Sequence, residues 1–424
     1  MRFASLFAGA AAGLLFVTSA QALPQCKGAD GYAASFGGRS TYQLRPDALL
    51  ATKARIDKDP KSVPAYAALI ADADRAMTRG PWSVMDKTST PPSGDKHDYI
   101  SMGPYFWPDP TQPDGLPYID RDGETNPERG TAVFDRTEYG SMTGTVSVLA
   151  QAYYFSGDEK YAKRAALILK TWFLDPATRM NPNLNFGQSI PGAMTGRAYG
   201  LIDSNSMVSV VEAIGLLAPS HALSDADMKG LRLWFGDFVT WMTTNRIGTD
   251  ERDATNNHAI IYDVQLTEFA LFSGKVDVAK RVANQFAERR IDTQMAPDGS
   301  LPRELARTLS FHYSVWAFQA VLDEATLSEC VGVDLWHYSS PEGLGIKRGL
   351  AFLQPYIGHE RDWKWKDLHM DENAEDTSLL YGTFLKAARG YRDPALAALV
   401  APYGTKYTQS RLNLTVPPPV NGAY

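Results

Sequence analysis

The stretch TEYGSMTGTVSVLAQAYYFSGDEKYAKRAALILKTWFL, residues 137–174, decides the fold class. Its second half carries apolar residues at helical spacing on one stripe: Tyr161, Ala165, Ile168, Leu169 and Trp172. Gly157 ends the first half, and Asp158 stands where an N-cap belongs. The stretch therefore predicts two helices joined by a tight turn, an αα-hairpin.

The same helical pattern recurs on both sides of this hairpin. The further predicted pairs are 46–56 with 61–78, 205–218 with 224–244, 256–273 with 275–291, 310–328 with about 344–356, and 375–389 with 393–402. Between them, no run of alternating polar and apolar residues predicts a strand. About six successive hairpins predict an all-α fold, an incomplete (α/α) toroid or barrel, in one domain over residues 23–424.

Two connections between the predicted hairpins are unusually long, 79–136 and 175–204, and both are rich in proline, glycine, asparagine and aromatic residues. Loops of this length inside a compact domain are usually functional, although plain surface excursions are the alternative. Tyr105, Trp107 and Tyr118 lie in the first loop, off any helical stripe. Because aromatic faces pack against the C–H faces of sugars, we expect these three residues to bind a carbohydrate substrate.

The first 22 residues predict a secretory signal peptide. One arginine precedes an apolar run from Leu6 to Val17, and small residues end at Ala20-Gln21-Ala22, which fits an A-x-A cleavage site. The apolar run is too short for a transmembrane helix. We therefore expect a periplasmic or secreted protein without a membrane anchor.

The composition is that of an ordinary globular protein, with 44% hydrophobic and 21% charged residues. A net charge of −6 makes nucleic acid an unexpected partner, and an anionic ligand would require cations gathered in a cleft. The two cysteines, Cys26 and Cys330, are open to either reading, a disulfide in an exported protein or two free thiols. We expect a monomer.

No cofactor or catalytic-metal motif is present in the sequence. It has no phosphate-binding loop, no dinucleotide fingerprint and no G-x-S-x-G, and its seven histidines form no H-E-x-x-H. We therefore expect no cofactor and no metal in the reaction. A structural calcium ion stays open, because acidic clusters such as Asp120-Arg121-Asp122 follow no loop template.

The segment TNNHAIIYDVQ, residues 255–265, begins a predicted helix with Thr255 or Asn256 as its cap. Asn257 and His258 then occupy the first turn, where unpaired amide groups and the positive end of the helix dipole attract an anion. Asparagine adds an amide donor, and histidine adds a ring that donates or accepts a hydrogen bond. A structural, hydrogen-bonded histidine is the alternative for His258.

The segment RELARTLSFHYSVWAFQ, residues 303–319, supplies the other chemistry. Arg303 and Arg307 are four residues apart and share a face if this part is helical. Arg307 and Tyr313 are six apart, so they converge only if the helix begins after Arg307. Ser310 is the expected N-cap, which places His312 and Tyr313 near the helix start.

Asn257-His258, followed further along by Arg307 and Tyr313, resembles the alginate lyase superfamily of α/α-toroid polysaccharide lyases. The loop GPYFWPDP…DGLPYIDRDGETNPE and the segment DGSLPRELARTLSFHYS also resemble bacterial members, and the similarity covers roughly residues 95–360. It is closer to the branch that includes glucuronan lyases than to the mannuronate lyases of alginate export. The resemblance implies an anionic polyuronate as substrate and cleavage of a 4-linked uronide by β-elimination.

The resemblance also implies roles for single residues. Asn257, His258 and Arg307 would neutralise the uronate carboxylate, and Tyr313 would be the base and then the acid. An unperturbed tyrosine has a pKa near ~10, so Arg307 or a histidine would have to lower it. Further substrate contacts would come from four more residues, namely His312, Asn185, Gln188 and Arg303, and Arg179 and Arg197 would bind further carboxylates.

A single phenol can perform a syn elimination in β-D-mannuronate and in β-D-glucuronate, because H5 and O4 lie on the same side of both sugars. The residues do not distinguish these two substrates, nor endo from exo action. A glycoside hydrolase on the same scaffold is the first alternative, and its two carboxyls would come from Asp135, Glu138, Asp203, Asp263 and Glu304. A noncatalytic polyuronate-binding protein is the second.

Overall fold

The computed structural model of the chain describes residues 24–373 and 377–419, so the predicted signal peptide lies outside the described residues. All six predicted hairpins are present. Their helices are α1 (Pro46–Lys58) and α2 (Pro64–Ala76), α3 (Arg136–Ser156) and α4 (Glu159–Phe173), α5 (Met207–Leu217) and α6 (Asp225–Thr244), α8 (Asn257–Phe272) and α9 (Val276–Phe286), α12 (Ser310–Ser328) and α13 (Ile346–Leu353), and α15 (Ser378–Tyr391) and α16 (Pro394–Val400).

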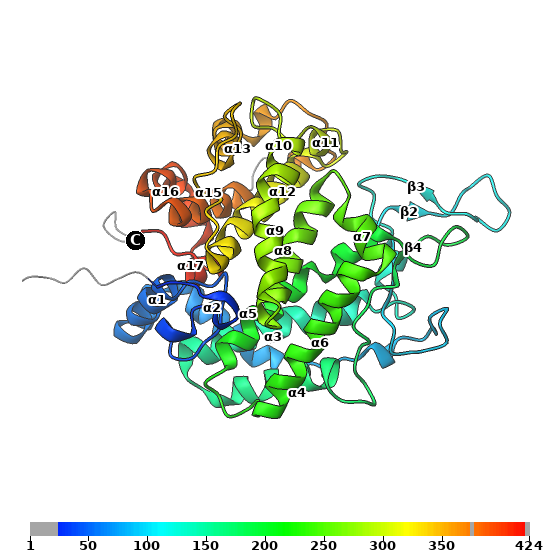
Figure 1. Cartoon of the computed structure of the whole chain (residues 1–424), viewed down its shortest axis with the longest axis horizontal. Helices are drawn as coiled ribbons and strands as arrows, with labels where there is room; N and C mark the ends of the chain where they lie inside the picture. Colours follow the sequence, from blue (N-terminus) through cyan, green and yellow to red (C-terminus); the bar gives the residue numbers. More distant parts are fainter. Residues whose placement is uncertain (1–23, 374–376, 420–424) are drawn as a thin grey trace, which may run out of the picture.

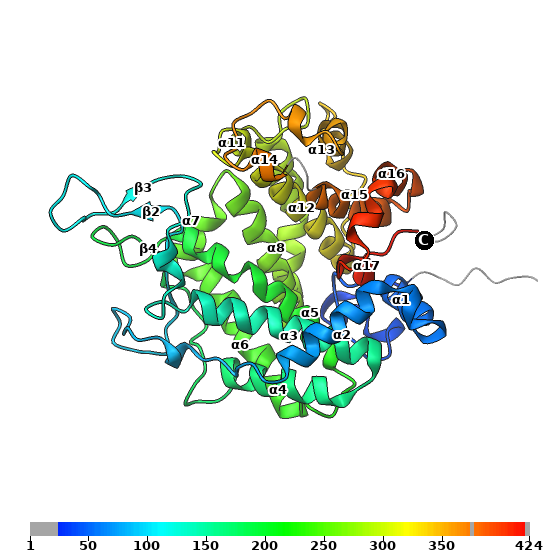
Figure 2. The same ribbon diagram turned by 180° about the vertical axis from the view of Figure 1, so that it is seen from behind.

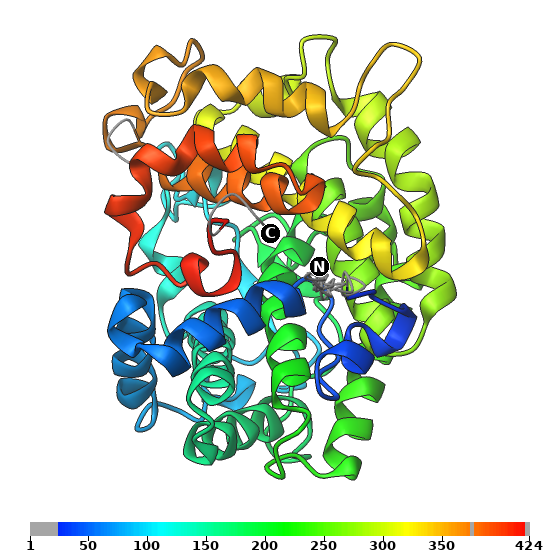
Figure 3. The same cartoon turned by 90° about the vertical axis from the view of Figure 1, so that its left-hand side faces the viewer.

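The hairpins form the predicted incomplete α/α toroid, an all-α fold (Figure 1). In the five hairpins after α1 and α2, one helix belongs to an inner ring, in which α3, α5, α8, α12 and α15 each contact the next. The inner helix α8 is buried at every residue, because neighbours pack on all of its faces. The short helix α17 (Leu412–Thr415) contacts both α1 and α2, so the two ends of the chain meet at one seam (Figure 3).

Local capping explains several helix boundaries. Asp158 caps α4 as predicted, and Ser224 forms a capping box at the start of α6. Asn256 is the cap of α8, since its side chain accepts a hydrogen bond from the His258 amide. The prediction for Ser310 was wrong: it is the first residue of α12, and the Asp367 carboxylate accepts from the Phe311 amide instead.

Other departures from the predicted helices are local. Residues Ala198–Ser206 form a 3-10 segment ahead of α5, and Ala287–Ile291 continue α9 as a π-helix. Additional short helices are α7 (Arg246–Arg252), α10 (Asp292–Gln294), α11 (Pro302–Leu305) and α14 (Met370–Asn373). The segment Ala198–Leu217 is long and apolar enough to cross a membrane, but 72% of its most apolar window is buried inside the fold, as in a core helix.

The two long loops meet at one end of the toroid (Figures 1 and 2). Strand β1 (Ile100–Met102) pairs in parallel with β4 (Phe186–Ser189), which joins the first loop to the second. Strands β2 (Phe106–Trp107) and β3 (Ile119–Asp120) form a small antiparallel pair on a projecting arm. These two- to four-residue strands were not predicted, because they are too short to give an alternating pattern.

A disulfide joins Cys26 to Cys330, which decides between the two readings of the cysteines. Both residues are almost fully buried and belong to the hydrophobic core. The bond fixes the start of the described chain to the end of α12, far from the long loops.

Candidate active site

A polar cavity of about 560 Å³ lies where the two long loops cover the first turns of α8 and α12. The arm contributes Tyr105, Asp120 and Asp122 to its lining, and the second loop contributes Gln188 and Arg197. His258 comes from α8, Tyr313 comes from α12, and Arg307 lies just before α12. The fold therefore brings together the segments that the sequence singled out.

Tyr313 points its hydroxyl into this cavity from the first turn of α12. Its Oη lies 2.6 Å from Oη of Tyr105, and the Arg307 guanidinium lies over its ring, 3.8 Å from the ring centre. This approach requires the chain to leave the helical path between Arg307 and Ser310, where α12 begins. The predicted break between Arg307 and the helix is therefore confirmed.

Burial raises the pKa of Tyr313 well above its ordinary value, and this effect outweighs the opposing attraction of Arg307, while Tyr105 adds to the increase. Arg307 lowers the pKa of Tyr313 as expected, but it does not bring this pKa below its ordinary value in the free protein. The cation is present where predicted, but burial destabilises the charged phenolate by more than Arg307 stabilises it. Tyr313 is a neutral phenol in the free protein.

Arg307 is held by the carboxylate of Asp122, which was not predicted as a residue of the site. Its Nη2 donates to Oδ1 of Asp122 at 2.6 Å, and its Nε donates at 3.2 Å. Asp122 also accepts from the amide and the hydroxyl of Thr308, at 3.0 and 2.8 Å. Burial alone would raise the pKa of Asp122, but the hydrogen bonds from Arg307 and Thr308 lower it to about 2.

His258 is oriented by a buried carboxylate of α7. Its Nδ1 lies 2.6 Å from Oε1 of Glu251, which is fully buried, so this contact fixes the orientation of the imidazole ring. The ring of Tyr199 stacks on the His258 ring with 4.1 Å between centres. The imidazole is thus held between a carboxylate and an aromatic face, with its other nitrogen left for the cavity.

Asn257 does not line the cavity, although its neighbours do. Its side chain is fully buried, its Nδ2 donates to Glu304 at 2.7 Å, and its backbone amide donates to the same carboxylate at 2.6 Å. The capping residue Asn256 faces the cavity instead. Asn257 therefore fixes the start of α8. This geometry does not provide the predicted direct contact between Asn257 and the substrate carboxylate.

Arginines without carboxylate partners surround the remaining wall. Arg197 donates to Oε1 of Gln188 at 2.8 Å and lies over the rings of Phe106 and Tyr199, at 4.8 and 5.2 Å. Arg129 and Arg136 also line the cavity. Within residues 24–373 and 377–419, none of these three arginines forms an ion pair, and with Arg307 they outnumber the acidic side chains of the lining, which are Asp120, Asp122 and Asp203.

The other predicted substrate-binding residues lie outside the lining of the cavity. Three of them form hydrogen bonds elsewhere: Trp107 donates to the Glu124 carbonyl, Tyr118 donates to Glu128, and Asn185 accepts from Trp241. The other two are exposed to solvent, Arg303 and, beside Trp316, His312. Arg303 also shares no helix face with Arg307, because α11 ends before Arg307. Arg179 likewise lies away from this cavity, whereas Arg197 belongs to it.

The carboxyls proposed for a hydrolase do not form an opposed pair across the cavity. Asp135 pairs with Lys87, Asp263 pairs with Arg290, and Glu304 binds Asn257. Glu138 is absent from the lining, and Asp203 faces the cavity but accepts from Tyr99, Ser101 and Gln188. A retaining or inverting hydrolase needs two such groups. In the described part of the chain, no group of three or more potential metal ligands is gathered.

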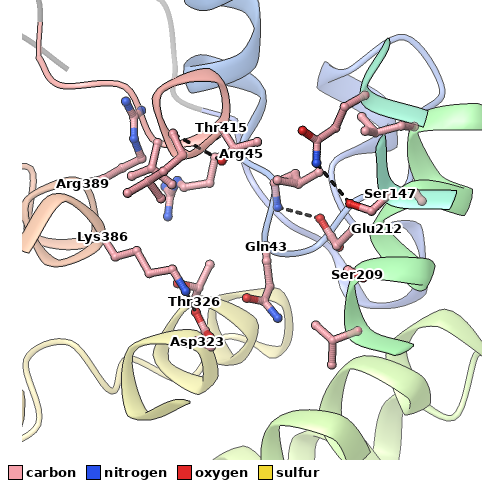
Figure 4. Close-up of a pocket in the computed structure, with 18 residues that line it drawn as sticks. Gln43, Arg45, Ser147, Ser209, Glu212, Asp323, Thr326, Lys386, Arg389 and Thr415 are labelled. Carbon is pink, nitrogen blue, oxygen red and sulfur yellow. Dashed lines mark hydrogen bonds and ion pairs between the residues drawn. The ribbon is translucent and has the colours of Figure 1, made fainter. Parts of the chain in front are cut away.

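A second cavity, of about 220 Å³, lies at the opposite end of the inner ring (Figure 4). Its charged side chains are satisfied within the fold. Lys386 pairs with Asp323, Arg389 pairs with Asp47, and Glu212 accepts from two backbone amides. It contains neither a tyrosine nor a histidine, so the reaction belongs to the cavity beneath the long loops.

This α/α toroid gathers unpaired arginines around a buried tyrosine hydroxyl, an arrangement that suits an anionic polysaccharide. The fold and the site together define a polysaccharide lyase. A family model described as alginate lyase matches residues 83–363. The chain belongs to this family, as the sequence resemblance implied, and it is a polysaccharide lyase acting on uronate polymers.

Two solved structures illustrate the likeness. An alginate lyase from Bacteroides ovatus shares 39% sequence identity over 89% of this chain and 99% of its own, with a TM-score of 0.85. Alginate lyase A1-III from Sphingomonas species A1 shares 14% identity over 78% of this chain and 88% of its own, with a TM-score of 0.47. No curated protein matches the chain.

Proposed function

We propose that this lyase cleaves 1,4-linked β-D-uronate polymers, glucuronan or mannuronan, by syn β-elimination and leaves 4,5-unsaturated uronate ends. The observation that carries the proposal is the buried Tyr313 hydroxyl, which shares one cavity with Arg307, His258 and Arg197. A single proton-transferring group beside several cations suits a reaction that removes H5 and expels O4 on the same face. The protein would act in the periplasm or outside the cell, as a monomer.

The first step is neutralisation of the carboxylate at C5. Arg307 already shares its charge with Asp122, so it supplies only part of this neutralisation. His258 and Arg197 face the same cavity, and Arg197 has no carboxylate partner among the described residues. Donors fixed before the substrate arrives stabilise the enolate-like charge that develops as the C5–H bond breaks.

The second step is the proton transfer by Tyr313. Its phenolate takes the proton from C5, the electron pair of that bond forms the C4–C5 double bond, and the C4–O4 bond breaks. The tyrosine then returns the proton to O4 of the leaving chain, which restores the phenolate and balances the reaction. The raised pKa makes this phenolate scarce but strongly basic once it forms.

The decisive test compares Tyr313→Phe with Tyr118→Phe, the same change on the arm outside the cavity lining. Both variants are given mannuronan, guluronan, glucuronan and hyaluronan, and the ultraviolet absorbance of the unsaturated product is followed. We expect Tyr313→Phe to keep its fold and its substrate binding and to lose turnover, whereas Tyr118→Phe stays active.

Three other outcomes would overturn the proposal. Turnover by Tyr313→Phe above a small fraction of the wild-type rate would exclude Tyr313 as the acid and base. Cleavage without new ultraviolet absorbance would indicate a hydrolase. Binding of the polymers by the wild type without any cleavage would indicate a binding protein.

A further inference from the structure

A groove of about 560 Å³ lies between α2 and the first half of α3, beside Arg411 at the seam where the chain's two ends meet. Its positive side chains are Arg75, Arg79, Arg136 and Arg411, and Asp72 is its one acidic side chain. Arg75 forms an ion pair with Asp72, so Arg79, Arg136 and Arg411 give the groove a net positive charge in a chain whose net charge is −6. Such a local reversal of charge attracts a polyanion.

Arg136 connects this groove to the reaction cavity, because it lines both. It stands at the start of α3 and forms no ion pair within the described residues, and its buried Nε has no hydrogen-bond partner. Arg136 therefore lies between the reaction cavity and the groove.

The floor of the groove is a stretch of α3 that carries little side-chain bulk. A Cβ placed on Gly144 would have no atom within 4 Å, and one placed on Gly140 would contact only Arg136, at 3.6 Å. Glycine in the middle of a helix is destabilising relative to alanine. These two glycines thus keep the helix backbone open to a close-lying chain at some cost to the helix.

We propose that this groove binds the uronate polymer beyond the reaction cavity, with its arginines contacting carboxylates of sugars that are not cleaved. The proposal rests on the proposed function and deepens it, because it makes the enzyme selective for long chains over short oligosaccharides. The walls fit this role: Arg75 has 70% of its side chain exposed, Arg79 lies over the Trp82 ring, and Arg411 is exposed on the far side.

A steric block tests the groove without changing its charge. Gly144→Trp fills open space on the floor, and Gly144→Ala leaves the groove open while making the same removal of glycine from the helix. We expect Gly144→Trp to lower kcat/KM for the polymer about tenfold and to leave kcat/KM for the tetrasaccharide of the same uronate within about twofold. This variant should melt no lower than the wild type. Gly144→Ala should behave as the wild type does on both substrates.

A charge change tests it independently. The triple variant Arg75→Gln/Arg79→Gln/Arg411→Gln is compared with Arg246→Gln/Arg281→Gln, which removes exposed arginines outside the groove. Exposed ion contacts are individually weak, so we expect the three losses together to lower polymer kcat/KM about tenfold, in the triple variant only. Added salt should weaken polymer cleavage less in the triple variant than in the wild type.

Wild-type selectivity for polymer in both tests would overturn the proposal. So would an equal loss on polymer and tetrasaccharide in folded protein, because the effect would then lie in the reaction cavity. Failure of the proposed function has a different signature, the absence of ultraviolet-absorbing product when wild-type protein meets polymer and tetrasaccharide alike, and the groove proposal falls with it.

Discussion

Asp122→Asn is the substitution that best tests how the arm controls the reaction. The variant keeps the shape of the side chain but removes its charge and presents an amide to Arg307. If the amide oxygen stays with Thr308, the Arg307 Nη2 hydrogen bond at 2.6 Å is lost, and Nε keeps only a neutral acceptor at 3.2 Å. Arg307 would no longer be fixed 3.8 Å from the Tyr313 ring centre.

The size of the effect follows from the environment of the pair. Lowering the Asp122 pKa from 3.8 to about 2 corresponds to roughly 2.5 kcal/mol of folding free energy at neutral pH. The side chains of Arg307 and Asp122 are 22% and 29% exposed, so solvent reduces this to about 1–2 kcal/mol. A similar loss of transition-state stabilisation lowers kcat about 5- to 30-fold.

The sign of the pH dependence gives a second measurement. A carboxyl with a lowered pKa stabilises the fold above its unfolded pKa of ~3.9, and that contribution is lost as the pH falls toward 2. The wild type should therefore melt higher than Asp122→Asn at pH 7, and the difference should shrink between about pH 4 and pH 2.

Initial rates from ultraviolet absorbance and thermal melting curves measure both effects. Asp114→Asn is the matched control, because Asp114 lies exposed on the same arm and only caps the amide of Leu116. A kcat within twofold of wild type, together with an unchanged melting temperature at pH 7, would show that Asp122 does not hold Arg307 in solution and would refute the reasoning.

Three further predictions concern other parts of the chain. Glu251→Gln should lower kcat about tenfold with little change in KM, because the glutamine amide holds the His258 ring less firmly than the carboxylate does; an effect on KM alone would contradict this. Because burial raises the pKa of Tyr313, the fraction of its phenolate form increases about tenfold per pH unit below that pKa. We therefore expect kcat/KM to rise between pH 6 and 9. A maximum of kcat/KM below pH 7 would exclude the phenolate as the base. Replacing Cys26 and Cys330 by alanine should lower unfolding free energy by about 2–5 kcal/mol in chemical denaturation and leave kcat unchanged, since α12 separates Cys330 from Tyr313 by about 25 Å.

Much of the site's framework was predictable because it depends on local spacing. The break between Arg307 and α12 follows from the six-residue interval to Tyr313, and the cap on α8 follows from the asparagines before His258. The partners that hold these groups were not predictable. Asp122 lies 185 residues from Arg307 along the chain, and no spacing rule connects them. Glu251 and Tyr199 were missed for the same reason, since each reaches His258 only through the packing of separate elements.

The sequence by itself determined the helical hairpins, the all-α toroid and the two loops that carry the chemistry, because helical periodicity and turn residues act over short distances. Only the tertiary structure decided that Asn257 faces Glu304, that Arg307 arrives already paired, and that burial raises the pKa of Tyr313. Each of these depends on which groups from distant segments surround a side chain and how far they exclude water. Those quantities exist only after the loops and helices have packed together.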